Sequence, residues 1–189
     1  MRNEHIAECG RIRNDMVQAF NATLEERVQR YLEVDHQKIT PNHHFAAASA
    51  ECLRLYVDGH FMGTVMMTQA VAEGIRRFVL ERNCLKLGEG VDGPDAAAQL
   101  RDDGVITPQC AEALERIWRS FRNDVHHMNP KVATIPLRQL AQSNIKDLAL
   151  IEREIFAVKV VTGAFVPVQP KYWDIKDDGT TAIFLRCSP

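Results

Sequence analysis

Long apolar runs are missing from this sequence. No stretch reaches the length that a membrane span requires, and the opening MRNEHIAECG lacks the apolar segment of a secretory signal. The five cysteines are scattered and form no C-x-x-C pair, which argues against a disulfide framework and against a zinc knuckle. Neither sign of charge dominates, because 23 Lys and Arg residues against 25 Asp and Glu residues give a formal net charge of -2. Any nucleic-acid or membrane site must then be local. We expect a soluble, cytoplasmic protein with no membrane association.

Recognisable phosphate and metal sites are also missing. The Gly-rich stretch GEGVDG, residues 88–93, holds no lysine, serine or threonine placed to bind phosphate, and it follows a helical pattern instead of a strand. Two pairs of adjacent histidines occur, His43–His44 and His126–His127. Neighbouring side chains on a helix point about 100° apart, and no acid-rich helix accompanies these pairs. We therefore expect neither a metal nor a cofactor.

The chain does contain strong helical periodicity. Its 189 residues, 46% of them hydrophobic, suit one domain with one core. Apolar residues recur at three- and four-residue steps, and Thr107 followed by Pro108 is a typical helix start. The pattern predicts helices over residues 12–34, 45–57, 61–83, 96–104, 108–129 and 137–158. The third of these is apolar on more than one face, which is typical of a central helix.

The pattern changes after Gly163, where β-branched and aromatic runs flank Asp178–Gly179, a hairpin signal. The fold class we predict is all-α, a helical bundle with a C-terminal β-hairpin appendage. The bundle domain covers residues 1–162 and the extension covers residues 163–189. Within the extension, packing of Tyr172 and Trp173 onto the bundle is a more common role for such residues than stacking on bases.

The stretch FRNDVHHMNP, residues 121–130, groups an arginine with two histidines. The guanidinium of Arg122 suits a phosphate, and an imidazole near neutral pH can take and return a proton. These are the groups that metal-free RNA cleavage needs, because there the 2′-hydroxyl of the RNA attacks the adjacent phosphorus. Arg116 and Arg119 precede Arg122 on the same predicted helix and are candidates for following an RNA backbone, although a solvated helix face is the commoner reason for such spacing.

This stretch resembles the motif of the HEPN superfamily (higher eukaryotes and prokaryotes nucleotide-binding domains). In it, Arg122 is followed by the polar Asn123 and, after four intervening residues, by His127. The order of segments over residues 46–157 is similar to that superfamily as well. The resemblance implies a HEPN-like helical bundle that forms a homodimer, with two motifs facing one another. It implies a metal-independent endoribonuclease that leaves a 2′,3′-cyclic phosphate, in which Arg122 binds the scissile phosphate, His127 is the general acid or base, and Asn123 orients the phosphate.

Two histidines compete for the catalytic role. The family spacing selects His127, whereas an ideal helix places His126 40° from Arg122 and His127 140° away. We favour His127 and keep His126 as the alternative. Gln69 and Glu73 lie one turn apart on the predicted central helix. A functional pair is one interpretation, and a hydrogen-bonded core pair or an edge position is the commoner role for such residues.

Other functions fit the same residues. Some HEPN proteins bind nucleotides or RNA without cleaving them, and others act as protein-interaction subunits. Members of toxin–antitoxin and antiphage defence systems bind RNA and, in some cases, an antitoxin or another complex partner. Toxins of this superfamily that pair with a nucleotidyltransferase antitoxin typically carry a tyrosine two residues after the histidine, where this chain has Asn129.

Overall fold

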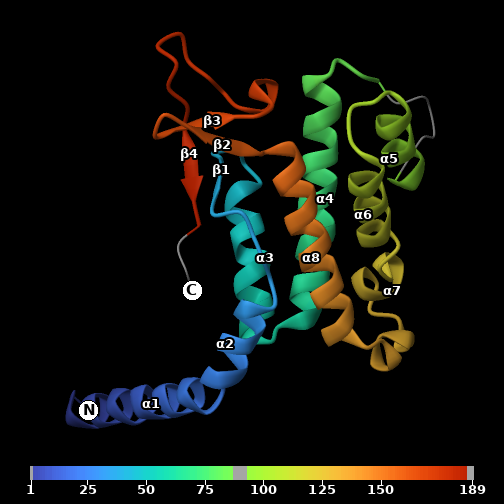
Figure 1. Cartoon of the computed structure of the whole chain (residues 1–189). Helices are drawn as coiled ribbons and strands as arrows, with labels where there is room; N and C mark the ends of the chain where they lie inside the picture. The colour runs from blue at the N-terminus through green and yellow to red at the C-terminus, as the bar shows by residue number, and fades with distance from the viewer. Residues whose placement is uncertain (1, 87–92, 187–189) are drawn as a thin grey trace.

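The computed structural model describes residues 2–86 and 93–186, and the chain is mainly helical with two small antiparallel sheets (Figure 1). The helices are α1 (Arg2–Ala22), α2 (Leu24–Leu32), α3 (Ala46–Asp58), α4 (Phe61–Arg82), α5 (Gly93–Asp102), α6 (Pro108–Trp118), α7 (Arg122–His126) and α8 (Leu137–Ile155). Short 3-10 helices are η1 (Pro130–Thr134) and η2 (Pro170–Tyr172). The strands are β1 (Ile39–Pro41), β2 (Val158–Val161), β3 (Ala164–Pro167) and β4 (Ile183–Leu185).

Helix α4 is the central element of the bundle. It packs against α3, α8 and α6, and its buried side chains lie on several faces, as the sequence predicts. Near its end, the ring of Phe78 lies close to those of Phe45, Phe156 and Tyr172. This aromatic group joins the start of α3, the end of α8 and the C-terminal segment into one core.

The predicted helix over residues 108–129 is wrong in its second half. It begins as expected, with the Thr107 hydroxyl accepting a hydrogen bond from the Cys110 amide at 3.2 Å. The helix then stops after Trp118, and Phe121 takes a left-handed conformation with a φ of 54° before the short α7 begins. The predicted helix over residues 12–34 is likewise two helices, which meet at Thr23.

The β-hairpin lies earlier than Asp178–Gly179. Strands β2 and β3 pair from Val158 opposite Pro167 to Val161 opposite Ala164, around Thr162 and Gly163. Both turn residues have positive φ, 50° and 83°, as a tight primed turn requires. Around Asp178–Gly179 the chain does turn, but the flanking residues form only an isolated bridge.

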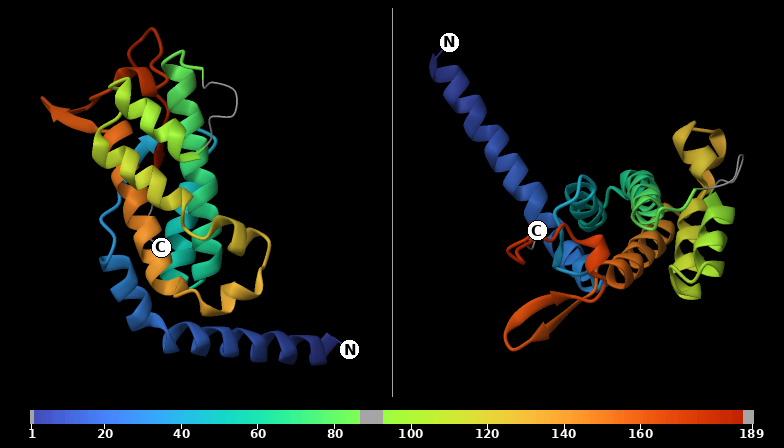
Figure 2. Two further views of the ribbon diagram at one scale, coloured as in Figure 1. Left: turned by 90° about the vertical axis from the view of Figure 1, so that its right-hand side faces the viewer. Right: turned by 90° about the horizontal axis from the view of Figure 1, so that it is seen from above.

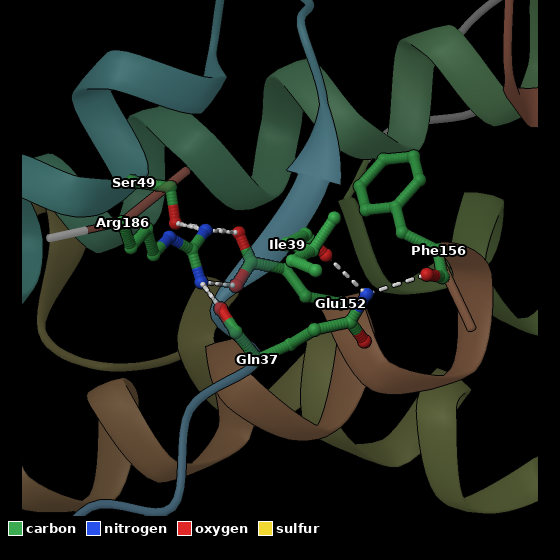
Figure 3. Close-up of polar contacts among 6 residues, drawn as sticks. All are labelled: Gln37, Ile39, Ser49, Glu152, Phe156 and Arg186. Atoms are coloured by element: carbon green, nitrogen blue, oxygen red, sulfur yellow. Dashed lines mark hydrogen bonds and ion pairs between the residues drawn. The ribbon is translucent and has the colours of Figure 1, made fainter. Parts of the chain in front are cut away.

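The C-terminal segment is integrated into the bundle. Strand β4 pairs with β1, and Tyr172 and Trp173 are buried, which confirms that they pack against the bundle. The Arg186 guanidinium lies between α3 and α8 (Figure 3). It donates to both carboxylate oxygens of Glu152, at 2.5 and 2.7 Å, and to the Ser49 hydroxyl at 2.7 Å.

Among the residues that the structure describes, no helix combines the length and the apolar composition that crossing a bilayer takes.

Candidate functional site

Helix α7 is attached to the central helix α4 by two polar contacts. The Arg122 Nη2 atom lies 2.8 Å from a carboxylate oxygen of Glu73, and the His126 Nε2 atom lies 3.0 Å from the Gln69 Oε1 atom. Gln69 and Glu73 are one helical turn apart on α4, and Arg122 and His126 are one turn apart on α7. The two contacts therefore lie side by side. Gln69 and Glu73 are therefore not merely a core pair, because they hold the arginine and one histidine of the motif.

The Gln69 contact fixes the tautomer of His126. The Gln69 amide nitrogen donates to the Ser120 carbonyl oxygen at 2.9 Å and to the Ser120 hydroxyl at 2.8 Å. A carbonyl oxygen can only accept, so the amide oxygen of Gln69 faces His126. His126 Nε2 must then carry the proton that it donates, which leaves Nδ1 as the ring atom free to accept one.

Arg122 is oriented from two directions. Besides Glu73, its guanidinium lies over the Trp118 ring, 4.2 Å from the ring centroid, in cation–π geometry. Glu73 also pairs with Arg77. Burial alone would raise the pKa of Glu73, but the hydrogen bond and charge of Arg122, together with the charge of Arg77, outweigh it and hold this pKa below its ordinary value. The Nη1 atom of Arg122 is buried and makes no hydrogen bond to any described residue.

An open hollow of about 730 Å³ lies beside Arg122. Its lining residues are Trp118, Arg119, Phe121, Arg122, Asn123, Asp124 and Lys131. Three of these side chains are cations, and each lies beside a carboxylate: Arg119 pairs with Glu115, Arg122 with Glu73 and Lys131 with Asp124. Lys131, which the sequence analysis missed, lies 5.2 Å from the Phe121 ring centroid and 3.9 Å from Asp124. The sequence feature that could have indicated Lys131 is its position directly after Asn129–Pro130, where the predicted helix ends.

His127 and Asn123 lie on the solvent side of α7. His127 is the residue that ends the helix, and its ring has no hydrogen bond or ion pair with any other part of residues 2–86 and 93–186. Asn123 is exposed and lines the hollow. The structure therefore separates the two histidines, since His126 is held by Gln69 and His127 is free to meet a ligand or a second chain.

The two upstream arginines lie in different environments. Arg116 is held by Asp147 through two hydrogen bonds, at 2.8 and 3.0 Å, which join α6 to α8. Arg119 pairs with Glu115 on its own helix and lines the hollow. Only Arg119 of the two is thus placed beside Arg122.

No family model matches the chain, and neither a curated protein nor a solved structure matches it. Across residues 2–86 and 93–186, no group of three or more His, Cys, Asp or Glu side chains is arranged to hold a metal ion.

Replacing Glu73 with glutamine is expected to lower the free energy of unfolding at neutral pH and to have a smaller effect in acid. The pKa of Glu73 is depressed in the folded chain, so its stabilising contribution is complete above the ordinary value of 4.5 and is lost as the pH falls below it. Urea unfolding of the parent and the variant at pH 7 and pH 3 measures the difference. Glu81→Gln, at an exposed position of the same helix, is the matched control. An equal effect of Glu73→Gln at both pH values would contradict this assignment.

Proposed function

We propose that this chain is a metal-independent endoribonuclease of the HEPN type and that it acts as a homodimer. The observation that carries the proposal is the position of Arg122, which lies beside a hollow that Arg119 and Lys131 also line, on the short helix that carries His126 and is followed by His127. A guanidinium so placed can bind a phosphodiester. Such an activity suits a cytoplasmic toxin–antitoxin or antiphage system, in which an antitoxin or another complex partner also binds the chain.

Each residue of the site has a role in this proposal. Arg122 binds the scissile phosphate and neutralises charge in the transition state. Asn123 orients the same phosphate, and Arg119 and Lys131 hold the adjoining RNA backbone. His127 transfers protons, while His126 positions the helix through Gln69.

The reaction needs both a base and an acid. A neutral imidazole takes the proton of the RNA 2′-hydroxyl, and the bond from O2′ to phosphorus forms as the bond from phosphorus to O5′ breaks. An imidazolium returns a proton to O5′. The products are a 2′,3′-cyclic phosphate and a 5′-hydroxyl. One His127 cannot be neutral and protonated at once, so the second chain supplies the other imidazole, and the site is complete only in the dimer.

A non-catalytic RNA- or nucleotide-binding module is the second candidate. The Glu73 carboxylate already neutralises one side of Arg122, which favours binding of a ligand over stabilisation of a pentavalent phosphate. Single-turnover assays on labelled RNA separate the two functions, because a binding module retains RNA without producing fragments.

Replacing the 2′-hydroxyl at the scissile nucleotide with hydrogen is expected to abolish cleavage and to leave binding nearly unchanged. The attacking group is then gone, while the phosphate contacts remain. EDTA is expected to have no effect, because no metal-bound water takes part. Gel assays of cleavage and filter binding of the matched RNA pair measure both quantities. Cleavage of the deoxy-substituted RNA at a comparable rate would rule out this mechanism even if the protein were a nuclease.

A further inference from the structure

Four polar side chains are buried together where α4, α6 and α8 lie side by side (Figures 1 and 2). They are Thr68 and Gln69 on α4, Ser120 after the end of α6, and Asn144 on α8, and none is more than 4% exposed. We call these four residues the polar network. Buried polar groups weaken a core unless they are hydrogen-bonded, whereas a fully bonded network fixes one arrangement of the elements that it joins.

Each hydrogen bond at the inner end of the polar network has one direction. The hydroxyls of Thr68 and Ser120 donate to backbone carbonyls three or four residues earlier in the chain, at 2.8 and 2.5 Å. A carbonyl oxygen only accepts, so each hydroxyl oxygen is left as an acceptor. The Asn144 amide nitrogen donates to both of them, at 3.2 Å to Thr68 and 3.0 Å to Ser120.

The fixed direction continues from Ser120 to His126. The Gln69 amide nitrogen donates to the Ser120 hydroxyl at 2.8 Å and to the Ser120 carbonyl at 2.9 Å, so both of its protons are used inside the core. The Gln69 amide oxygen therefore points outward, where it accepts from His126 at 3.0 Å. His126 is exposed, and the polar network reaches solvent at its ring.

A ring held in this way keeps its hydrogen bond through a proton transfer. Neutral His126 carries its proton on Nε2, and the imidazolium carries one on each nitrogen, so Nε2 donates to Gln69 in both states. Only Nδ1 gains or loses a proton. The ring and the short helix α7 need not move when the charge changes.

We propose that Ser120 is a positioning residue of the site and that Asn144 holds it in place. Ser120 sets the direction of the Gln69 amide, Gln69 holds one ring nitrogen of His126, and His126 anchors α7 together with Arg122. The effect of Ser120 on RNA cleavage rests on the proposed function. Its effect on the ring of His126 does not.

Nuclear magnetic resonance tests the ring directly. Above the pH at which the ring titrates in the same spectra, His126 should give a ring N–H cross-peak that long-range correlations assign to Nε2. His127 is the internal control, because its exposed ring has no hydrogen bond within residues 2–86 and 93–186 and its proton should exchange with water too fast to be seen. A missing His126 cross-peak, or a proton on Nδ1, overturns the proposal.

Ser120→Ala tests the positioning role, with Thr64→Val as the matched control. Each variant removes one buried hydroxyl, but that of Thr64 donates only to the carbonyl of His60 at the start of its own helix. Ser120→Ala leaves one Gln69 proton buried without an acceptor, and exchange of the His126 Nε2 proton should be about fivefold faster, as for one lost hydrogen bond. Gln69→Met is the second variant if Ser120→Ala does not fold, and it should remove the cross-peak altogether.

Single-turnover cleavage by the same variants separates positioning from stability. Ser120→Ala should slow cleavage at saturating RNA by up to roughly 10²-fold, the effect of a small displacement of reacting groups, and leave RNA affinity near the parent value. Thr64→Val should change neither the spectra of His126 nor the cleavage rate. Equal effects of the two variants, or cleavage by Ser120→Ala at the parent rate, overturn the proposal. A parent chain that cleaves no RNA refutes the proposed function alone, since the spectra of His126 still decide whether Ser120 positions the ring.

Discussion

Replacing Arg122 with alanine is expected to reduce single-turnover RNA cleavage by roughly 10²- to 10³-fold, the effect of removing one donor that stabilises transition-state charge. The fold should survive, because the ion pair with Glu73 and the contact with the Trp118 ring are at the edge of the bundle. Urea unfolding of the purified variant checks that the loss is chemical and not structural.

Arg119→Ala is the matched control for charge. Arg119 lines the same hollow but pairs only with Glu115 on its own helix. We expect this variant to bind RNA less tightly, with a weaker dependence on salt, and to cleave bound RNA at nearly the parent rate. Equal losses of the cleavage rate in Arg122→Ala and Arg119→Ala would mean that Arg122 acts only as one positive charge among several.

The same cleavage assay distinguishes the roles of the two histidines. His127→Ala should abolish cleavage, whereas His126→Ala should weaken it by loosening the contact with Gln69. If His126→Ala is inactive and His127→Ala is active, the helix-wheel choice of His126 is right and the family spacing is misleading. The free Nδ1 atom of His126 would then be the proton acceptor.

The elements predicted best are those whose signals are local. The apolar pattern of residues 61–83 gave the central helix almost to its ends, and Thr107 with Pro108 gave the start of α6. The break after Trp118 has no such signal. It depends on Ser120, whose buried hydroxyl accepts a hydrogen bond from Asn144 on α8 and one from Gln69 on α4. A tertiary network therefore overrides the periodicity of this stretch.

The sequence names candidate residues for the site but says nothing of the contacts between them. One helical turn separates Gln69 from Glu73, and one turn also separates Arg122 from His126. Nothing in the sequence says that these two helices face each other. The same limit applies to Arg116, whose position beside Asp147 depends on how α6 packs on α8. Distances between helices are set by the whole core, and periodicity describes only one helix at a time.

The buried contact between Arg186 and Glu152 shows why the C-terminal segment is not an appendage. Both side chains are only 3% exposed, and Gln37 donates from its amide to the Ile39 and Phe156 carbonyls beside them, at 2.6 Å each (Figure 3). Both Nη atoms of Arg186 donate to the Glu152 carboxylate, while the buried Nε atom of Arg186 has no hydrogen-bond partner among the described residues. Each partner left alone would be an uncompensated buried ion. The strand β4 is therefore held to the bundle by a contact that joins residues far apart in the sequence.

Glu152→Ala is expected to lower the free energy of unfolding by about 3–5 kcal/mol, because it leaves the Arg186 guanidinium buried without its counter-ion. The double variant Glu152→Leu/Arg186→Met should recover most of this loss, since it removes both charges and keeps the volume. Arg153→Ala is the control, because Arg153 on the same helix pairs with Asp35, which is 90% exposed, and should cost less than about 1 kcal/mol. Urea unfolding measures all three variants. A double variant less stable than Glu152→Ala would show that the ion pair itself stabilises the fold, and that its removal costs more than the burial of one unpaired charge.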